Sequence, residues 1–352
     1  MFQVWIYFRK GDLITIMKLM KLGSTAIDIS RIGLGTWAIG GGPAWGRDND
    51  ERDSINTIQK CPELGINLID TAPGYNFGNS ELVIGKALSE VDRAKFILIT
   101  KCGIVWKREG SLFNKVGDRQ LYKNLSRESI LEEVEESLER LQTDYIDVYM
   151  THWQAVEPYY TPISEVMATL GELKEQGKIR AIGVANATVE QVKEYLKYGK
   201  IEIVQAKYSI LDREVENELL QVCQENNITL QAYSPLEQGL LTGCLDKNYQ
   251  PVGAQLNKKW FQKLYMDSAI DMMASWKQLE EKYNCTIANL ALAWVLAQSP
   301  EINLLSGATT TEQIQENVRA CTIELANEDI EFMRKSAEEA EAKAEMIQQN
   351  EG

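Results

Sequence analysis

The chain contains a single histidine, His152, among its 352 residues. This scarcity excludes any zinc site that needs two histidine ligands, including the H-E-x-x-H class. Six cysteines are present, but none forms a C-x-x-C pair and the intervals between them are long and irregular. A metal cluster and a disulfide framework are therefore both unexpected. We predict reduced thiols in a cytoplasmic protein with no metal site.

Basic residues are also scarce. The 37 lysines and arginines are outnumbered by 51 aspartates and glutamates, which gives a net charge of -14. Sequence-independent binding to nucleic acid or to an anionic membrane requires a basic face, so we expect neither partner. No apolar run reaches the roughly 18 residues of a membrane span. The sequence leaves the oligomeric state open.

Residues 1–16 differ from the remainder of the chain. The apolar stretch 1–8 is followed by Arg9, Lys10 and Asp12. A signal peptide carries its positive charge before the apolar core and ends at a small-residue cleavage site, and neither feature is present. We predict that residues 1–16 are a disordered extension, with Met17 or Met20 as alternative starts. Residues 17–352 are predicted to form one domain.

Beyond residue 26, short runs of β-branched and aromatic residues alternate with stretches of helical period. The runs predict strands at 32–34, 66–70, 96–101, 145–151, 179–184, 203–206, 228–233 and 302–305. The periodic stretches predict helices at 51–64, 79–90, 127–141, 164–177, 188–198, 214–226, 287–297 and 311–320. Eight strand–helix units in alternation require a parallel sheet with helical crossovers.

Such a sheet can be doubly wound or closed into a barrel. Eight similar units, and the lack of G-x-G-x-x-G after the first strand, favour a (β/α)8 TIM barrel. Three segments lie outside the units: a hairpin at 18–30, an extra helix at 267–283, and a C-terminal helix at 324–352. The last carries nine acids against three bases, so we predict that solvent surrounds it. Residues 103–125 are interpreted as a loop that closes over the site.

Polar residues interrupt the buried strands at one end. Asp70, Lys101 and His152 end three consecutive strands, and Tyr75 lies in the loop after Asp70. Each has an ordinary structural explanation: a helix cap, a snorkelling lysine, a core histidine or a packed aromatic. Their occurrence together is harder to explain in that way. Because strand carboxyl ends converge on the active-site face of a barrel, we expect the four to meet there.

Chemistry suggests what such a set does. The ammonium of Lys101 is expected to stabilise the phenolate of Tyr75 and so to lower the tyrosine pKa, while Asp70 keeps the lysine charged. His152 is expected to orient a substrate carbonyl by hydrogen bonding. That assembly can protonate a carbonyl oxygen. No side chain delivers a hydride, so a nicotinamide cofactor is implied.

Several motifs now resemble those of the aldo-keto reductase family, and the similarity extends over about residues 20–327. They are GLGTW at 33–37, GINLIDTA at 65–72, GNSE at 78–81, YIDVY at 145–149, GKIR at 177–180, GVAN at 183–186, YSPL at 233–236 and GLLTG at 239–243. The resemblance implies a barrel with a hairpin at its bottom and an NAD(P)H-dependent oxidoreductase. The catalytic tetrad of the family falls on Asp70, Tyr75, Lys101 and His152.

The resemblance also implies an extended cofactor across the barrel top. Asn186 and Gln205 would hold the carboxamide, and Tyr233 would stack on the nicotinamide. The turn from Ser234 to Leu240 would bind the pyrophosphate through backbone N–H groups. The full set of implied cofactor residues is Gly35, Thr36, Trp37, Asp70, Asn186, Gln205, Tyr233, Ser234, Pro235, Leu236, Gly239, Leu240, Gly307, Ala308, Thr309, Gln313, Glu316 and Asn317.

Two positions depart from the family pattern. Ala185 replaces the usual serine before the carboxamide-binding asparagine, so one hydrogen bond should be lost or made through water. Gly307 and Gln313 stand where many NADPH-selective members place Lys and Arg against the 2′-phosphate. A phosphate without cationic partners loses its charge-assisted bonds. We predict that NADH is used at least as well as NADPH.

The expected substrates are small carbonyl compounds. Trp37, Phe77, Trp106 and Trp153 lie at or near strand ends and are predicted to line an aromatic pocket, with ordinary packing as the alternative. The THWQ stretch at 151–154 resembles bacterial members described as methylglyoxal reductases, which implies small aldehydes and α-oxoaldehydes as substrates. Two other functions stay open: a sugar or pyridoxal dehydrogenase working oxidatively, and a non-enzymatic regulatory subunit with a reductase-like barrel.

Overall fold

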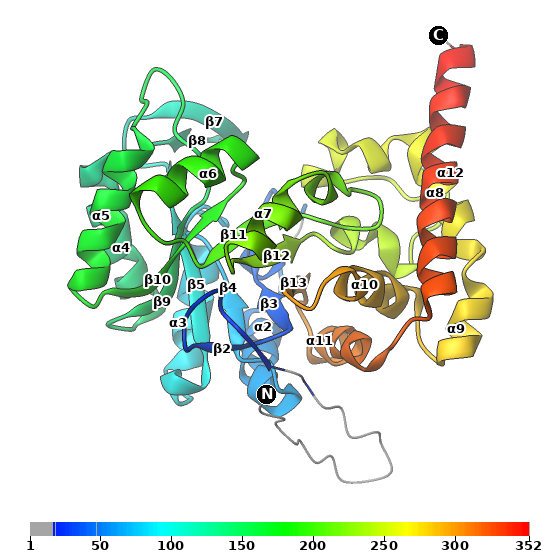
Figure 1. Ribbon diagram of the computed structural model, residues 1–352, viewed down its shortest axis with the longest axis horizontal. Coiled ribbons are helices and arrows are strands. Elements are labelled where there is room, and N and C mark those ends of the chain that lie inside the picture. The colour runs from blue at the N-terminus through cyan, green and yellow to red at the C-terminus, as the bar shows by residue number, and fades with distance from the viewer. Residues whose placement is uncertain (1–16, 18, 47, 352) are drawn as a thin grey trace.

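A computed structural model describes residues 17, 19–46 and 48–351 of the chain (Figure 1). The predicted extension over residues 1–16 lies outside the described residues. The assignment of the remaining residues to one domain stays a prediction.

Eight parallel strands close into a barrel, as the alternation of strands and helices predicted. Each pairs with its neighbours in parallel, and β3 closes the ring by pairing with β13, where Leu34 lies opposite Ser306. In order around the barrel the strands are β3 (Ile32–Gly35), β4 (Leu68–Asp70), β5 (Ile97–Cys102), β9 (Ile146–Thr151), β10 (Ile179–Ala185), β11 (Ile203–Lys207), β12 (Thr229–Tyr233) and β13 (Ile302–Gly307).

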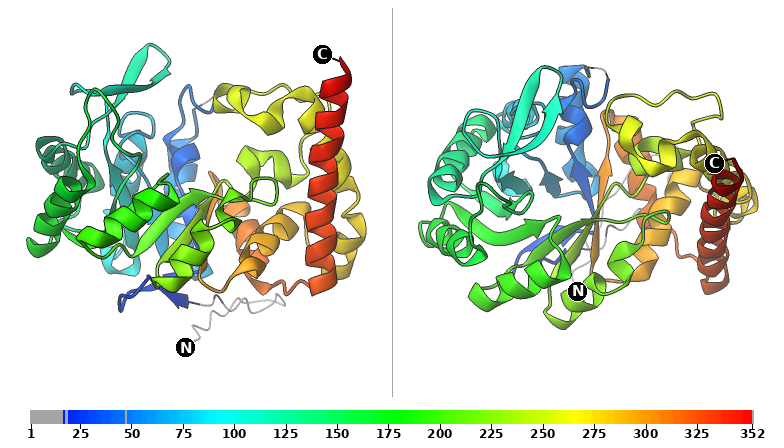
Figure 2. Two further views of the ribbon diagram at one scale, coloured as in Figure 1. Left: turned by 45° about the horizontal axis from the view of Figure 1, so that its top comes forward. Right: turned by 90° about the horizontal axis from the view of Figure 1, so that it is seen from above.

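The eight predicted helices follow their strands and surround the barrel (Figure 2). They are α2 (Glu51–Lys60), α3 (Asn79–Leu88), α4 (Arg127–Leu141), α5 (Ile163–Glu175), α6 (Val189–Tyr198), α7 (Leu219–Glu225), α10 (Ile287–Gln298) and α11 (Thr311–Val318). Side-chain oxygens of Ser126, Thr188 and Thr310 cap α4, α6 and α11, which satisfies amide groups that a helix start leaves without partners. Short helical turns supplement them: α1 (Trp37–Gly40), η1 (Cys61–Leu64), η2 (Arg93–Lys95), η3 (Glu214–Glu216), η4 (Glu237–Thr242), η5 (Gly253–Asn257), η6 (Lys259–Phe261) and η7 (Arg319–Thr322).

A hairpin of β1 (Leu19–Lys21) and β2 (Asp28–Ser30) covers the amino-terminal end of the barrel. Leu22 and Ile29 are fully buried in one cluster with barrel residues such as Leu68. The turn is held by Glu202, which accepts hydrogen bonds from the amide and hydroxyl of Ser24. Gly23 has a positive φ of 50°, and a Cβ there would lie 2.4 Å from the Glu202 carbonyl oxygen. One end of the barrel is therefore closed, and the carboxyl ends of the strands form the other.

The segment 103–125 is a small antiparallel sheet rather than the predicted loop. Its strands are β6 (Ile104–Val105), β7 (Ser111–Val116) and β8 (Arg119–Lys123). In Figure 1 the β7–β8 pair lies at the end of the molecule opposite the β1–β2 hairpin. Most of its residues are exposed or half-buried, so neither face needs a regular apolar pattern. That is why alternation did not reveal it in the sequence.

Two predictions about the C-terminal third are wrong. The expected single helix over 267–283 is two helices, α8 (Lys263–Ala274) and α9 (Lys277–Tyr283). The break comes at Trp276, which is fully buried and whose indole donates to Ser336 Oγ. Helix α12 (Asn327–Glu351) is not surrounded by solvent, because it packs along α8 and buries Met333, Ala337, Ala340 and Ala344. Its many charges occupy the other faces. No helix among the described residues is long and apolar enough to cross a membrane.

The packing of α12 can be tested by truncating its buried methionine. Met333→Ala should lower the free energy of unfolding by about 2–5 kcal/mol, because the change leaves a cavity in the core. Met346 on the same helix is 60% exposed, so Met346→Ala serves as the control and should change stability by less than about 0.5 kcal/mol. Urea unfolding of both variants makes the comparison. Unchanged stability of Met333→Ala would mean that α12 is solvated on all sides.

Candidate functional site

The structure brings Asp70, Tyr75 and Lys101 into direct contact at the carboxyl end of the barrel. Lys101 Nζ lies 2.8 Å from both carboxylate oxygens of Asp70 and 3.4 Å from the hydroxyl oxygen of Tyr75. It also donates to the carbonyl oxygen of Thr71 at 2.8 Å. The His152 ring lies edge-on to Tyr75, with 5.7 Å between ring centroids. The four residues predicted from strand ends therefore form one cluster.

The Lys101–Asp70 pair is buried, with side-chain exposures of 0% and 3%. Removing two charges from water is costly unless further hydrogen bonds satisfy them. Those bonds come from a chain of amides: Gln205 Nε2 donates to Asp70 Oδ2 at 2.8 Å and to Gln231 at 2.7 Å. Gln231 donates in turn to Asn303 at 2.7 Å. The pair is thus connected to three further barrel strands.

Burial also decides the protonation of the cluster. It raises the pKa of Asp70 and lowers the pKa of Lys101, and the attraction between the two charges opposes both shifts. The pKa of Tyr75 is raised well above its ordinary value, first by burial and then by the charge of Asp70. The predicted lowering of the Tyr75 pKa is wrong, because burial and the charge of Asp70 dominate the net shift. The phenol of Tyr75 is accordingly protonated at neutral pH.

His152 is held neutral by the same environment. Burial, followed by the charge of Lys101, lowers its pKa well below 6.5. Two hydrogen bonds hold the backbone of His152. The N–H of His152 donates to the Cys102 carbonyl oxygen at 2.9 Å, and the His152 carbonyl oxygen accepts from Asn186 Nδ2 at 2.9 Å. Nδ1 of the ring is buried and has no hydrogen-bond partner among the described residues. A neutral imidazole in this position can donate one hydrogen bond without carrying charge.

The residues predicted to hold a nicotinamide carboxamide lie beside the cluster. Tyr233, the last residue of β12, donates from its hydroxyl to Asn186 Oδ1 at 2.8 Å. Both amide protons of Gln205 are donated to protein partners, so its carbonyl oxygen is the atom left for a ligand. Ala185 is fully buried and offers no hydroxyl. At the opposite rim, Thr36 Oγ1 donates to the Asp70 carbonyl at 2.8 Å, between Gly35 and Trp37.

The predicted pyrophosphate turn is tightly wound. Ser234 has a φ of 54°, and Glu237, Gln238 and Gly239 have φ of 44°, 53° and 98°. Three amides of this turn, those of Glu237, Gly239 and Leu241, donate to the carbonyl oxygens of Ser234 and Leu236 within it. The carboxylate of Glu237 is engaged by Lys207 at 2.9 Å and Ser209 at 2.6 Å, so its charge is neutralised. Glu237 therefore presents no uncompensated negative charge that would repel a pyrophosphate.

The predicted adenosine residues follow β13 and lie on α11. Gln313 Oε1 accepts from the Thr309 amide at 2.8 Å, and Asn317 Nδ2 donates to the Gly307 carbonyl at 3.2 Å. Ala308 is buried between them. Glu316 differs, because its carboxylate binds Thr286 and Arg319. Neither 307 nor 313 carries a basic side chain that could meet a 2′-phosphate.

The four predicted substrate residues take part in separate aromatic contacts. Trp37 lies 6.3 Å from Tyr75, Phe77 lies 5.7 Å from Trp106, and Trp153 lies 5.4 Å from Phe113, measured between ring centroids. Phe113 is a partner in these contacts that the sequence reasoning missed, because it lies in the segment interpreted as a loop. Gln231 and Asn303 were also missed, although each is a polar residue inside a buried strand, which is the signal that identified Asp70.

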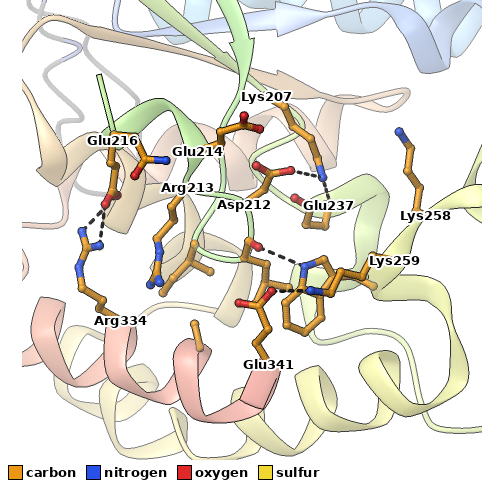
Figure 3. Close-up of a pocket in the computed structure, with 15 residues that line it drawn as sticks. Lys207, Asp212, Arg213, Glu214, Glu216, Glu237, Lys258, Lys259, Arg334 and Glu341 are labelled. Carbon is orange, nitrogen blue, oxygen red and sulfur yellow. Dashed lines mark hydrogen bonds and ion pairs between the residues drawn. The ribbon is translucent and has the colours of Figure 1, made fainter. Parts of the chain in front are cut away.

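A cavity of about 470 Å³ lies elsewhere, between the segment after β11, η6 and α12 (Figure 3). None of the four clustered residues lines it. Ion pairs cross its walls, including Glu216 with Arg334 at 2.7 Å and Lys259 with Glu341 at 2.6 Å. It meets the predicted pyrophosphate turn through Glu237. No group of three or more side chains suited to a metal ion occurs among the described residues.

Comparison with known proteins points to one family. The model described as "Aldo/keto reductase family" matches residues 31–338. An Escherichia coli protein described as "NADH-specific methylglyoxal reductase" is 60% identical over 325 residues, which are 92% of this chain and 100% of that protein. A solved glycerol dehydrogenase from Gluconobacter oxydans is 30% identical, with a TM-score of 0.80 over 93% of this chain and 95% of that one. A Klebsiella pneumoniae aldo-keto reductase solved in complex with NADPH is 26% identical, with a TM-score of 0.68 over 91% and 94%.

The neutrality of His152 can be measured by NMR, because the chain has no other imidazole. We expect the folded protein, without a histidine tag, to titrate well below pH 6.5, since burial and Lys101 disfavour the imidazolium. The same residue in urea should titrate near about 6.5. Because only the unfolded chain takes up this proton readily, His152 weakens the fold as pH falls below that value. A folded midpoint at or above 6.5 would contradict the assignment.

Proposed function

The chain belongs to the aldo/keto reductase family and is an oxidoreductase, and from that premise we propose that it reduces small aldehydes and α-oxoaldehydes, such as methylglyoxal, to alcohols with NADH or NADPH. The observation that carries the proposal is the contact between the Tyr75 hydroxyl and the Lys101–Asp70 pair beside a neutral His152. The name of the Escherichia coli relative supports this substrate class and this cofactor.

Tyr75 is proposed as the general acid. A bound nicotinamide cofactor supplies the hydride for the carbonyl carbon, and Tyr75 donates its proton to the carbonyl oxygen as negative charge develops there. The raised pKa of Tyr75 keeps this proton in place before reaction. Lys101, 3.4 Å from the hydroxyl oxygen, then stabilises the phenolate left behind.

His152 and Asp70 are proposed as the positioning groups of the tetrad. A neutral imidazole donates a hydrogen bond to the substrate carbonyl without competing with Tyr75 for its proton, because its pKa lies well below 6.5. Asp70 holds the ammonium of Lys101 through two contacts of 2.8 Å. The substrate thus approaches a protonated phenol with a fixed cation behind it.

The cofactor is proposed to lie along β11, β12 and β13, on the residues named from the family resemblance. Asn186 and the carbonyl oxygen of Gln205 would bind the carboxamide, and the turn after Tyr233 would bind the pyrophosphate. The positive φ values of that turn and the neutralised Glu237 support this placement. Glu316 already accepts one hydrogen bond on each carboxylate oxygen, from Thr286 and Arg319, and a donor of adenosine would share these oxygens with them.

Oxidation of alcohols is a second candidate direction. It is favoured by the similarity to the Gluconobacter oxydans glycerol dehydrogenase, since the same tetrad can accept a proton from a hydroxyl. We propose a cytoplasmic location for either direction, supported by the lack of a C-x-x-C pair and the irregular spacing of the six cysteines. Assays with methylglyoxal plus NADH, and with glycerol plus NAD, compare the two directions.

Replacing the proposed acid provides the first test. Tyr75→Phe removes the hydroxyl and keeps the ring, so kcat for methylglyoxal reduction should fall by at least about a hundredfold. NADH binding, measured by fluorescence titration, should be retained because the cofactor does not depend on this hydroxyl. Wild-type turnover by Tyr75→Phe would refute the mechanism.

Cofactor choice provides the second test. We expect kcat/KM for NADH to equal or exceed that for NADPH, because no cation stands at Gly307 or Gln313. Gln313→Arg should raise kcat/KM for NADPH by about tenfold, the value of one charge-assisted hydrogen bond. Gln315→Arg adds the same charge two residues further along α11 and is the control. A hundredfold preference of the wild type for NADPH would overturn the prediction.

A further inference from the structure

We propose that Lys123 is an anion-recognition residue at the outer wall of the substrate site, and that the enzyme prefers aldehydes carrying a carboxylate or phosphate at the end remote from the carbonyl. This inference rests on the proposed function, because it assumes that the tetrad reduces an aldehyde. It adds the chemical class of the group that the far end of the site receives.

The first support is the place of Lys123 relative to the tetrad. Lys123 is the last residue of β8, and its Nζ lies 5.2 Å from the ring centroid of Trp153 and 5.5 Å from that of Phe113. Trp153 follows His152 directly in the chain. The ammonium therefore lies over two aromatic rings, one of which belongs to the residue that follows His152.

The second support is the local backbone. The pairing of β7 with β8 is regular except between Leu112 and Asn114, where Phe113 is an extra residue in a bulge. A bulge redirects a side chain and is common beside functional sites. Here it accompanies the contact of Phe113 with both Trp153 and Lys123.

The third support is that this wall is anchored to the segment carrying His152. Ser111 Oγ donates to the Val156 carbonyl at 2.6 Å and accepts from the Tyr159 amide at 3.1 Å. Tyr159 also donates from its hydroxyl to Glu109 at 2.8 Å. The β7–β8 sheet and the segment after β9 are thus joined by hydrogen bonds beside the contact between Phe113 and Trp153.

The fourth support is charge. The chain has a large acidic excess, and the neighbouring Arg108 pairs with Glu132 and Glu136 of α4. Lys123, by contrast, has no carboxylate partner among the residues that the structure describes, and burial alone shifts its pKa. Burial lowers its pKa, and no opposing charge offsets this. A half-buried cation without a counter-ion attracts an anionic group that can reach it. Arg119, over the ring of Phe77 at 4.8 Å, adds a second cation on the same strand.

A purely structural role for Lys123 is the alternative. A lysine over two aromatic rings gains cation–π energy whether or not it meets a substrate. The two roles differ in what they predict, because packing affects all aldehydes alike, whereas anion recognition affects charged aldehydes alone. The two roles are therefore distinguished by the ratio of kcat/KM for a charged aldehyde to kcat/KM for its neutral counterpart.

The experiment compares kcat/KM for succinic semialdehyde with butanal, and for glyceraldehyde 3-phosphate with glyceraldehyde, with NADH. We expect the wild type to favour at least one anionic member, and Lys123→Gln to reduce that anionic-to-neutral ratio by about tenfold. Lys123→Arg should keep the ratio. Lys115→Gln, an exposed lysine on β7 without an aromatic partner, is the control and should also keep it. The substrate pair whose ratio falls in Lys123→Gln shows whether the bound group is a carboxylate or a phosphate.

A ratio near one in the wild type, or one that Lys123→Gln leaves unchanged, would overturn the inference. So would a ratio insensitive to salt between 50 and 500 mM, because a partly exposed charge interaction is screened. If no aldehyde is reduced, the proposed function fails instead. Calorimetric binding of butyrate against butyramide, in the presence of NAD, then tests Lys123 without turnover: butyrate must bind more tightly, and the difference must vanish in Lys123→Gln.

Discussion

The ion pair between Lys101 and Asp70 is the interaction on which the site depends. It lies inside the barrel, where an unpaired charge would be far too costly, and it is stable only because its remaining hydrogen-bonding groups are satisfied. Thr71 accepts the third bond of the ammonium, and Gln205 donates to the carboxylate. Through Gln231 and Asn303 this network reaches β12 and β13. Side chains from several barrel strands therefore hold the ammonium of Lys101 and the carboxylate of Asp70 in position.

That pair also sets the electrostatics around it. Its two charges partly compensate each other. Burial therefore shifts the pKa values of the neighbouring groups more than the ammonium does. The pKa of Tyr75 therefore rises and the pKa of His152 falls, and both are neutral at physiological pH. A neutral donor beside a neutral acid suits the proposed protonation of a carbonyl oxygen, because charge appears only as the reaction proceeds. The compensated Glu237–Lys207 pair applies the same principle at the turn proposed to bind pyrophosphate.

Much of this could be predicted from the sequence. The eight strands and helices were found because buried parallel strands and amphipathic helices have distinct periods. Asp70, Lys101 and His152 were found because a charge at a buried strand end is conspicuous. The β7–β8 sheet was missed because its largely exposed strands lack apolar alternation, and α12 was misjudged because its buried stripe consists largely of alanine. Phe113 and Lys123 remained hidden with the sheet that carries them.

The barrel, the order of its strands and the residues that meet at its carboxyl end could all be read from the sequence, because they follow from patterns within each strand–helix unit. Only the tertiary structure decided the protonation of Tyr75, the commitment of Glu316 to Arg319, and the position of Lys123 against Trp153. Each of these depends on burial and on partners from distant segments. The four residues proposed as the tetrad are thus recognisable in the sequence, whereas their charge state is a property of the folded molecule.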